Sequence, residues 1–296
     1  MKSLVTGGTG FVGRHLVAQL ARPVVAGRNP KKIRHLFGEI ESRVWNSTGA
    51  IDPGLFDGVD AVFHLAGESV AKGRWNTAKK HQIRFSRVES TRQLVAALGR
   101  MDRPPRTLVC ASAIGYYGDR GAEWLSESAS AGTDFLAGVC QEWEQEAARA
   151  AEFGVRVVSV RTGMVLGRDG GALQQMLPLF RLGLGGWLGN GRQYLSWIHV
   201  QDLVGIMLRA AQDQTLQGPV NGVAPGAVTN RELTRILARV LRRPALLPVP
   251  ALALRLILGE FASVLLGSQR VRPDKALAAG YVFAFPELKQ ALADIV

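Results

Sequence analysis

The sequence predicts an α/β protein built on a doubly wound, parallel sheet with helices on both faces. Two observations favour this fold class. Short apolar stretches alternate with segments whose apolar residues recur at helical spacing, and strands that are apolar throughout are typical of a sheet buried on both sides. The 296 residues are also 47% hydrophobic and 20% charged, a composition that can bury a large core. We therefore expect one large domain or two closely packed ones.

Six strands are expected in the first part of the chain, and enough residues separate them for crossover connections. They cover residues 2–6, 24–26, 43–45, 61–65, 107–111 and 155–160. Helices are expected from residue 11, over 77–98, and over 136–147 with Gly154 as the stop, because apolar residues recur there every three or four positions. Strands and helices thus alternate, as they do in a parallel sheet.

The chain changes character after the sixth strand, where glycine, proline and irregular segments become frequent. The elements expected there are a helix after Asp202, another capped by Asn230, a buried apolar helix over 252–266, an aromatic strand over 281–285 and a last helix. They form a small C-terminal α/β lobe for the substrate. The expected boundaries are 1–165 for the main domain and 166–296 for the lobe, with residues of about 196–224 packing back onto the main domain.

The charge balance narrows the kind of ligand. Lys and Arg number 36 against 24 Asp and Glu, a formal charge of +12, which fits nucleic acid, an acidic membrane surface or a small anionic ligand. The basic residues are mostly arginines scattered along the chain, and no basic motif is interleaved with aromatics. We therefore expect a small anionic ligand and no nucleic-acid partner.

Composition also bears on the compartment. No stretch approaches the roughly 18 uncharged apolar residues of a membrane span, since the richest one, after Pro244, meets Arg255 and Glu260. Glycines follow the first strand too soon for a secretory signal. Cys110 and Cys140 lie 30 residues apart with no CxxC or nearby His pair, so no disulfide framework and no metal site are expected. We expect a cytoplasmic protein without a membrane partner, in which Cys110 packs in a strand.

A glycine turn stands between the first strand and the first helix. Gly7, Gly10 and Gly13 have the G-x-x-G-x-x-G spacing. In such a turn the first glycine permits the tight bend, the second lets the backbone approach a pyrophosphate, and the third lets helix and strand pack closely. The helix N-terminus then faces the phosphates. The sequence therefore predicts a Rossmann-type dinucleotide-binding domain.

The end of the second strand indicates which dinucleotide is bound. An NAD enzyme places an Asp or Glu there, about 20 residues after the glycine turn, for the ribose 2′-hydroxyl. Here the strand ends at Arg28, and the first acidic residue of the chain is Glu39. Arg28, helped by Lys31 or Lys32, would meet a 2′-phosphate through a charge-assisted hydrogen bond. We predict NADP(H) as the cofactor; the alternative is a solvated arginine.

Four sequence blocks stand at the glycine turn, after the fourth and fifth strands, and early in the lobe: 6–13, 63–67, 112–118 and 196–202. They resemble the extended short-chain dehydrogenase/reductases, which include nucleotide-sugar epimerases. Further blocks resemble an atypical epimerase branch of the NAD-dependent epimerase/dehydratase type with a C-terminal domain of unknown function: 67–68, 74–75, 86–88, 161–167, 182–186, 268–271 and 279–281. The resemblance covers essentially the whole chain and implies the Rossmann-type fold and a nicotinamide cofactor.

The resemblance also implies where the cofactor is held. The contacts come from the glycine turn, the end of the second strand, the turn after the fourth strand, the following helix and the segment after the sixth strand. The expected residues are Gly7, Thr9, Gly10, Phe11, Val12, Gly13, Arg28, Leu65, Ala66, Gly67, Arg87 and Val165.

The usual catalytic residues of the family are missing. Ordinary members use a Tyr and a Lys four residues later on one helical face, where the lysine and the nicotinamide lower the pKa of the tyrosine. Here these positions fall on Leu136 and Cys140, and the usual Ser/Thr position falls on Ala113, next to Ser112. A shift of one residue in this alignment would bring Ser112 into place.

Three other side chains remain as catalytic candidates at the nicotinamide end: Tyr116, Glu68 and Ser112. Tyr116 replaces an aliphatic residue of the wider family and is predicted to face the substrate. For Glu68 the alternatives are catalysis, helix capping or an ion pair with Arg74.

Three further polar features are predicted to be structural. Tyr117 is expected to pack, and His199 and Asp202 to act as hydrogen-bonded struts. The basic helix near 79–92 and the acidic one near 142–152 would be neighbours, with a solvated or mutually paired face.

Two hypotheses of function stay open. The first is an NADP(H)-dependent oxidoreductase or epimerase-like enzyme of unknown substrate that lacks the usual Tyr/Lys pair. The second is a non-catalytic NADP(H)-binding sensor or regulatory protein. We favour the enzyme because Glu68, Arg74, Tyr116 and Trp197 are retained around the expected cleft. The partner is then a small-molecule substrate, and the protein is a monomer or a homodimer.

Overall fold

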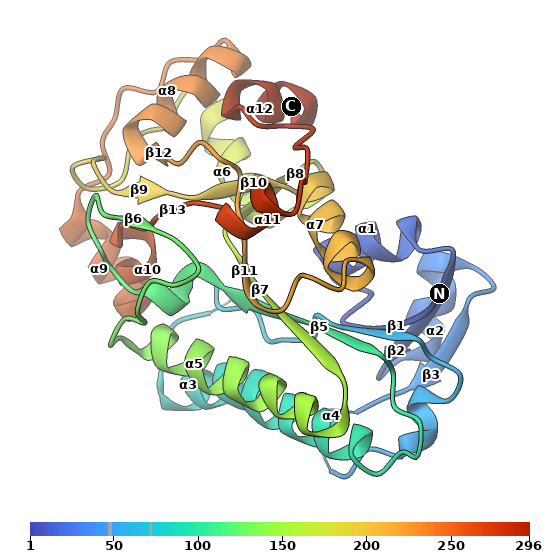
Figure 1. Ribbon diagram of the computed structural model, residues 1–296. Helices are drawn as coiled ribbons and strands as arrows, with labels where there is room; N and C mark the ends of the chain where they lie inside the picture. The colour runs from blue at the N-terminus through green and yellow to red at the C-terminus, as the bar shows by residue number, and fades with distance from the viewer. Residues whose placement is uncertain (47–48, 72) are drawn as a thin grey trace.

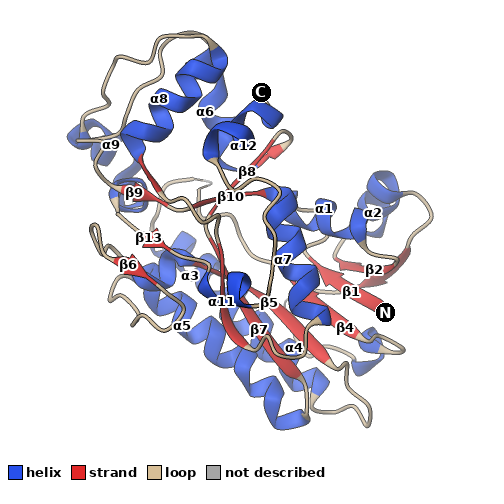
Figure 2. Cartoon of the chain, turned by 45° about the horizontal axis from the view of Figure 1, so that its top comes forward, coloured by secondary structure: helices blue, strands red, loops and turns tan. Residues whose placement is uncertain are grey.

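The computed structural model describes residues 1–46, 49–71 and 73–296, and within them a seven-stranded sheet forms the centre of the molecule (Figures 1 and 2). Its strands are β1 (Lys2–Thr6), β2 (Arg22–Gly27), β3 (Glu41–Val44), β4 (Ala61–His64), β5 (Thr107–Ala113), β7 (Arg156–Thr162) and β11 (Gly218–Gly222). All run parallel, in the order β11-β7-β5-β4-β1-β2-β3. The strand order therefore reverses between β1 and β4, which is where Rossmann-type sheets bind nucleotides.

Helices cover both faces of this sheet, which confirms the expected fold class. On one face lie α1 (Phe11–Gln19), α2 (Pro30–Phe37) and α7 (Val200–Gln212), and on the other α3 (Thr77–Arg84), α4 (Ser90–Leu98) and α5 (Phe135–Ala148) (Figure 1). Neighbouring residues of one strand enter opposite cores. Leu4 belongs to the core that contains Trp143, whereas Val5 belongs to the core that contains Leu16. The strands are apolar throughout because both of their faces are buried.

The helix expected over 77–98 is present but contains a π turn. α3 ends at Arg84, Phe85–Glu89 form the π turn, and α4 begins at Ser90. Single π turns inside helices often occur at functional sites, and this one carries Arg87. The spacing of apolar residues gave no sign of it.

Beyond β7 the chain forms the smaller lobe at the top of Figure 1, apart from α7 and β11, which belong to the central sheet and the layer that covers it. β8 (Met164–Gly167) pairs with β10 (Trp197–His199), β9 (Tyr194–Leu195) with β12 (Val228–Thr229), and β6 (Trp124–Leu125) with β13 (Arg270–Val271). The helices are α6 (Gly171–Arg181), α8 (Asn230–Leu241), α9 (Ala251–Leu258), α10 (Ala262–Leu266), α11 (Asp274–Ala278) and α12 (Leu288–Ile295). Short 3-10 turns cover Pro53–Phe56, Ile114–Tyr117, Arg149–Phe153 and Gly259–Phe261.

The predicted cap of α8 is wrong by one residue. Thr229, not Asn230, is the N-cap: its Oγ1 accepts a hydrogen bond from the Glu232 N–H at 3.2 Å. The Glu232 carboxylate in turn accepts from the Thr229 N–H at 2.7 Å. This reciprocal pair is a capping box. Asn230 is instead the first residue of the helix, and its side chain accepts from the Leu188 N–H at 2.7 Å.

Two predictions for the C-terminal segment are also wrong. Residues 281–285, all described, are irregular rather than a strand, because the N–H groups of Ala284 and Phe285 bond to the Asp202 carboxylate at 2.7 and 2.9 Å. The apolar segment 252–266 divides at Gly259 into α9 and α10. It is not a core element, since much of the apolar face of α9 lies at the surface.

Candidate functional site

The glycine turn joins β1 to α1 where the strand order reverses. Gly7 has a φ of +71°, and a Cβ added there would lie 2.7 Å from the backbone of Leu65 in the turn after β4. A Cβ on Gly13 would lie 2.3 Å from the carbonyl oxygen of Gly7. Both positions therefore require glycine for the fold itself.

Gly10 differs from these two glycines. Its φ is −79°, which suits any residue, and a Cβ there would lie 3.2 Å from the Gly7 carbonyl oxygen. Gly10 is the exposed N-cap of α1; no side chain caps this end, and the first turn holds no acidic residue. The Gly10 N–H donates to the Gly7 carbonyl oxygen at 2.9 Å, so it is the N–H groups of the first turn of α1, after the half-buried Thr9, that are open to an anion.

Phe11, the first residue of α1, packs against the lobe. A Cβ added to Gly167, Gly170 or Gly171, at the turn between β8 and α6, would lie 2.6, 2.4 or 3.0 Å from atoms of Phe11. Val12 and Val165 pack, half-buried, against the core under α1 and α7. Val165 also pairs with Ile198 in the ladder of β8 and β10.

Arg28 stands at the carboxyl end of β2, exposed to solvent. The next residue, Asn29, caps α2 by accepting a hydrogen bond from the Lys32 N–H at 3.0 Å. Glu39, the nearest carboxylate along the chain, pairs with Arg34 at 3.7 Å. Across the described ranges no carboxylate forms an ion pair with Arg28, so its guanidinium stands ready for an outside anion.

Arg87 lies under the turn after β4. A Cβ added to Gly67 would lie 3.3 Å from the Arg87 Cζ atom. The guanidinium donates to the Ile83 carbonyl oxygen at 3.1 Å and lies 5.3 Å from the Trp143 ring centroid. Burial lowers the pKa of Arg87. The π turn thus holds a positive group against Leu65, Ala66 and Gly67, the backbone that the sequence predicts to contact the cofactor.

Glu68 follows this turn and pairs with Lys79. Its Oε1 lies 2.7 Å from the Lys79 Nζ, and its N–H donates to the Ser86 Oγ at 3.0 Å. Arg74, the ion-pair partner that the sequence suggested for Glu68, donates to the Leu256 carbonyl oxygen at 3.4 Å. The Glu68 carboxylate is therefore held by α3, the helix that follows its own segment.

Ser112, at the end of β5, belongs to a buried polar network. Its Oγ donates to the Glu144 Oε1 at 2.6 Å. Arg161, on β7, holds the same carboxylate with two hydrogen bonds of 2.8 Å and is 3% exposed. Sequence reasoning missed the pair of Glu144 and Arg161. The signal was weak, because α5 carries three glutamates and β7 two arginines, and the sequence does not say which of them pair.

The two tyrosines after β5 both contact Arg161. Its Cζ lies 3.4 Å from the ring centroid of Tyr116, which is half-buried. Tyr117 is fully buried, as predicted; its hydroxyl donates to the Asn221 Oδ1 at 2.6 Å and accepts from Arg161 at 3.1 Å. Burial raises the pKa of Tyr117 to about 12. Ser112 and Tyr116 thus meet around one ion pair, whereas Glu68 pairs with Lys79 on another segment.

Leu136 and Cys140 occupy the same face of α5, next to the backbone of Gly115. A Cβ on Gly115 would lie 3.4 Å from the Leu136 Cβ and 4.0 Å from the Cys140 Sγ. Burial raises the pKa of the Cys140 thiol to about 12, so it stays protonated at neutral pH.

A groove runs along β7 between α5 and β11. Its lining includes Tyr116, Gln141, Gln145, Arg156, Ser159 and Gly218. None of its lining residues belongs to the glycine turn, so this hollow is separate from the nucleotide end of the sheet.

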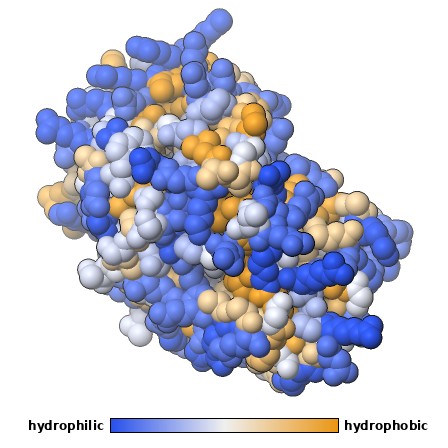
Figure 3. Space-filling view, in the orientation of Figure 1, coloured by the Kyte–Doolittle hydropathy of each residue, from blue (hydrophilic) through white to orange (hydrophobic). Residues whose placement is uncertain are grey.

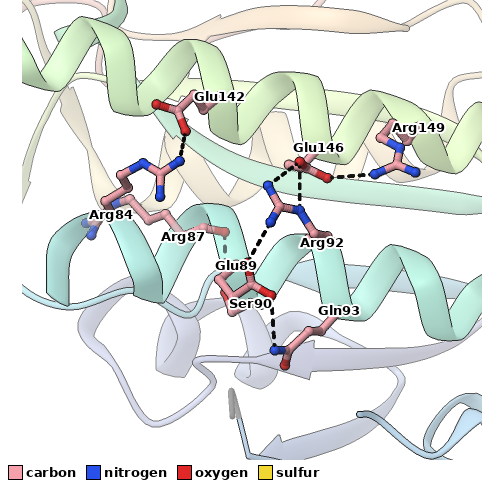
Figure 4. A network of polar contacts seen from close by, with 9 residues as sticks. All are labelled: Arg84, Arg87, Glu89, Ser90, Arg92, Gln93, Glu142, Glu146 and Arg149. Carbon is pink, nitrogen blue, oxygen red and sulfur yellow. Dashed lines mark hydrogen bonds and ion pairs between the residues drawn. The ribbon is translucent and has the colours of Figure 1, made fainter. Parts of the chain in front are cut away.

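The basic and acidic helices are neighbours and their charges pair, as one of the two predicted alternatives required (Figure 4). Arg84 contacts Glu142, and Arg92 binds Glu146 at 2.8 Å. Arg149 joins Glu146 from the end of α5 at 3.2 Å. These pairs tie α3 and α4 to α5.

Asp202 acts as a strut, as predicted. Its carboxylate is fully buried and accepts a hydrogen bond from the Tyr281 hydroxyl at 3.1 Å, besides those from the two backbone groups described above. His199 caps α7 through its Nδ1, which accepts from the Gln201 N–H at 3.3 Å.

Several negative findings apply to the described ranges, which omit residues 47, 48 and 72. Within them no three His, Cys, Asp or Glu side chains are arranged to hold a metal ion. No helix there is long and apolar enough to cross a membrane. Cys110 and Cys140 are free and buried, and Cys110 packs in β5 as predicted.

The parallel sheet, the bare N-terminus of α1 and the glycine turn define a Rossmann-type nucleotide-binding protein. Residues 3–223 match the NAD dependent epimerase/dehydratase family, and residues 249–295 match a domain of unknown function, DUF1731. The chain belongs to the NAD dependent epimerase/dehydratase family.

Similar proteins occur in distant organisms. Epimerase family protein Mb2239 of Mycobacterium bovis is 40% identical over 291 residues, covering 97% of this chain and 95% of that protein. The SDR39U1 homolog of Arabidopsis thaliana, named chloroplastic, is 38% identical over 306 residues, 99% of this chain and 86% of that protein. The crystal structure of human epimerase family protein SDR39U1 (isoform 2) with NADPH has a TM-score of 0.89 and 34% identity, covering 100% of this chain and 99% of that one.

Proposed function

We propose that this chain is an NADP(H)-dependent oxidoreductase or epimerase-like enzyme of the short-chain dehydrogenase/reductase type, with a small-molecule substrate. The observation that carries the cofactor choice is Arg28. It stands exposed at the end of β2, and the first acidic residue of the chain is Glu39. A 2′-phosphate fits this environment better than a bare ribose hydroxyl does. The human relative, crystallised with NADPH, supports the same choice.

The glycine turn would bind the pyrophosphate through the N–H groups around Gly10, since no side chain occupies this end of α1. The backbone of 65–67 would line the other side of the cofactor, with Arg87 behind it. When bound, NADP(H) supplies hydride transfer. The chain's own residues must then orient the substrate and exchange a proton with it.

Tyr116 and Glu68 are the proposed proton donors. Arg161 lies 3.4 Å from the Tyr116 ring centroid, and its positive charge would stabilise a phenolate after the proton has left. Glu68 is held by Lys79 at 2.7 Å; this ion pair stabilises the deprotonated carboxylate, so Glu68 would give a substrate a proton only after taking one from the Lys79 ammonium. Ser112 donates its own proton to Glu144, so its oxygen remains free to accept a hydrogen bond from a substrate hydroxyl.

The alternative is a non-catalytic NADP(H)-binding sensor. It is favoured by Leu136 and Cys140, which stand where the family's Tyr and Lys are expected and cannot replace them. A location in the cytoplasm and a monomeric or homodimeric state remain predictions for either function.

The cofactor choice is tested by titrating the purified chain with NADPH and NADH. The wild type should bind NADPH at least about tenfold more tightly, and Arg28→Ala should lose most of that preference, because a charge-assisted hydrogen bond contributes about 1.5–3 kcal/mol. Arg34→Ala, which removes a nearby exposed arginine, is the control and should leave the preference unchanged. Equal affinities in the wild type, or an unaltered preference in Arg28→Ala, would contradict the proposal.

The chemistry is tested by screening carbonyl substrates with NADPH. Turnover should fall by roughly 100-fold in Tyr116→Phe or Glu68→Gln, the usual contribution of a general acid, and should survive Cys140→Ser. Loss of turnover in Cys140→Ser with both other variants intact would show that the donor assignment is wrong. Tight NADPH binding without turnover, together with a partner that binds only the cofactor-loaded protein, would favour the sensor.

A further inference from the structure

The lobe carries an exposed apolar face that neither the fold nor the nucleotide site explains. It consists of Leu182, Leu184, Leu246, Leu247, Leu252, Leu256 and Ile257, which we call the leucine face. Their exposed fractions run from 55% for Leu184 to 74% for Leu246. In Figure 3 hydrophobic residues reach the surface at the left edge of the lobe, where Figure 1 places α9. Grouped exposure of this kind marks an interaction site.

The residues of this face come from two segments that run side by side. The Gly189 N–H donates to the Val249 carbonyl oxygen at 2.9 Å, and the Val249 N–H donates to the Trp187 carbonyl oxygen at 2.8 Å. α9 begins directly after this contact. The two segments that carry the leucine face therefore lie next to each other in the lobe.

α9 has a buried side and an exposed side, and its exposed side is largely apolar. Leu254 is buried at 7% exposure and anchors the helix. Leu252 and Leu256, one turn apart, are 67% and 69% exposed, and Ile257 is 71% exposed. Arg255 is exposed on the same side of the helix.

The charges around this face are mainly positive. Residues 174–201 and 233–259, which supply all seven of its apolar side chains, carry seven arginines and no Asp or Glu. Arg181, Arg242, Arg243 and Arg255 are exposed. Of the acids that border these ranges, Asp202 is buried, Glu232 belongs to the capping box of α8 and Glu260 pairs with Lys80. Two copies of the chain meeting here would bring mainly arginines together. The partner must therefore offer both apolar surface and negative charge.

We propose that the leucine face binds the surface of a membrane that contains anionic phospholipids. The leucines and Ile257 would enter the headgroup and acyl boundary, while the arginines contact lipid phosphates. This association is peripheral and needs no spanning helix. It revises the sequence-based expectation of no membrane partner, which rested on the lack of a span, and it is independent of the proposed function.

The test measures binding of the full chain to vesicles by co-sedimentation. Vesicles of phosphatidylcholine with phosphatidylglycerol should bind the protein, phosphatidylcholine vesicles should bind much less, and added salt should weaken binding. Leu252→Gln with Leu256→Gln should weaken binding at least about tenfold. Arg242→Gln with Arg243→Gln should weaken it by about fivefold for each arginine.

Val282→Gln is the control, since Val282 is an 86% exposed apolar residue outside the leucine face. It should bind vesicles like the wild type, and circular dichroism should show that every variant is folded. No binding to phosphatidylglycerol vesicles, or unchanged binding in the Leu252/Leu256 variant, would overturn the proposal. So would a concentration-dependent dimer that this variant abolishes, because the occupant would then be a second copy.

Discussion

The nucleotide side of the sheet has two regions, the phosphate end at the glycine turn and the end formed by β5 and α5, and they are built from different parts of the chain. At the phosphate end the glycine turn offers backbone N–H groups, and no side chain caps α1. At the other end Ser112, Glu144 and Arg161 bond to one another, and Tyr116 stacks on the same guanidinium. The first end can receive an anion without giving up a contact. At the second end Ser112 can donate to a substrate only by giving up its hydrogen bond to Glu144.

This difference separates binding from chemistry in the molecule. Backbone N–H groups at a helix N-terminus can bind phosphate whatever the side chains are. Cofactor binding at this end therefore depends on keeping the space in front of α1 free of side chains. Side chains that satisfy one another contribute to stability as well as to any reaction. Substitutions at the phosphate end should therefore lower NADPH affinity, whereas substitutions at the other end should lower stability. Four predictions test this difference.

The largest effect is expected for Gly10→Val. The backbone at position 10 has a φ of −79° and an added Cβ meets only the Gly7 carbonyl oxygen, at 3.2 Å, so the variant should fold. Its side chain would occupy the phosphate position, and NADPH affinity should fall by at least about a hundredfold. Circular dichroism and NADPH titration measure the two properties. Normal NADPH binding in this variant would show that the backbone of the glycine turn does not bind the phosphates.

Glu144→Gln should lower stability rather than cofactor binding. It would leave the buried guanidinium of Arg161 without its partner, which typically costs about 3–5 kcal/mol. Glu142→Gln, two residues earlier on α5, breaks only the exposed pair with Arg84 and should cost no more than about 1 kcal/mol. Urea unfolding of both variants measures the difference. Equal losses would show that the buried network does not stabilise the second end.

His64 gives the sheet between the two ends a dependence on pH. Burial lowers the pKa of His64 from 6.5 to about 4, and its Nδ1 lies 2.7 Å from the Thr6 Oγ1. The folded protein keeps the ring neutral while the unfolded chain takes up a proton, so stability should fall as the pH drops from 6.5 toward 4, by about 3 kcal/mol in all. His64→Gln should remove this part of the slope. Parallel curves of stability against pH for wild type and variant would contradict it.

The smallest effect is expected for Arg87→Ala. The loss of a charge behind the cofactor backbone should weaken NADPH by about tenfold, with a smaller change in the free energy of unfolding. Arg84→Ala, on the same helical segment but paired with Glu142, is the control and should leave NADPH affinity unchanged. If Arg87→Ala binds NADPH normally, the π turn belongs to the packing of α5 and not to the cofactor end.

The glycine turn and the parallel sheet were predictable because each depends on local spacing: glycines after a strand, and apolar stretches. The choice of NADP(H) depended on the absence of an acid near Arg28, and the contact of Arg28 with the cofactor stays a prediction. The pair of Glu144 and Arg161 was not predictable, since its partners are 17 residues apart in sequence and meet only when α5 packs on β7. The segment over 252–266 was misread for a related reason. Apolar composition predicts burial, but it does not say whether the chain supplies the surface that covers a helix.

Phe11 connects the main domain with the lobe, because it belongs to α1 and packs against the turn between β8 and α6. Its ring fills the space left by Gly167, Gly170 and Gly171, and the same residue is the first of the helix that begins at the glycine turn. The turn between β8 and α6 therefore packs around the first residue of α1. Any movement of the lobe relative to the sheet would have to move Phe11 or break this contact, so the position of the lobe and the position of the glycine turn depend on each other.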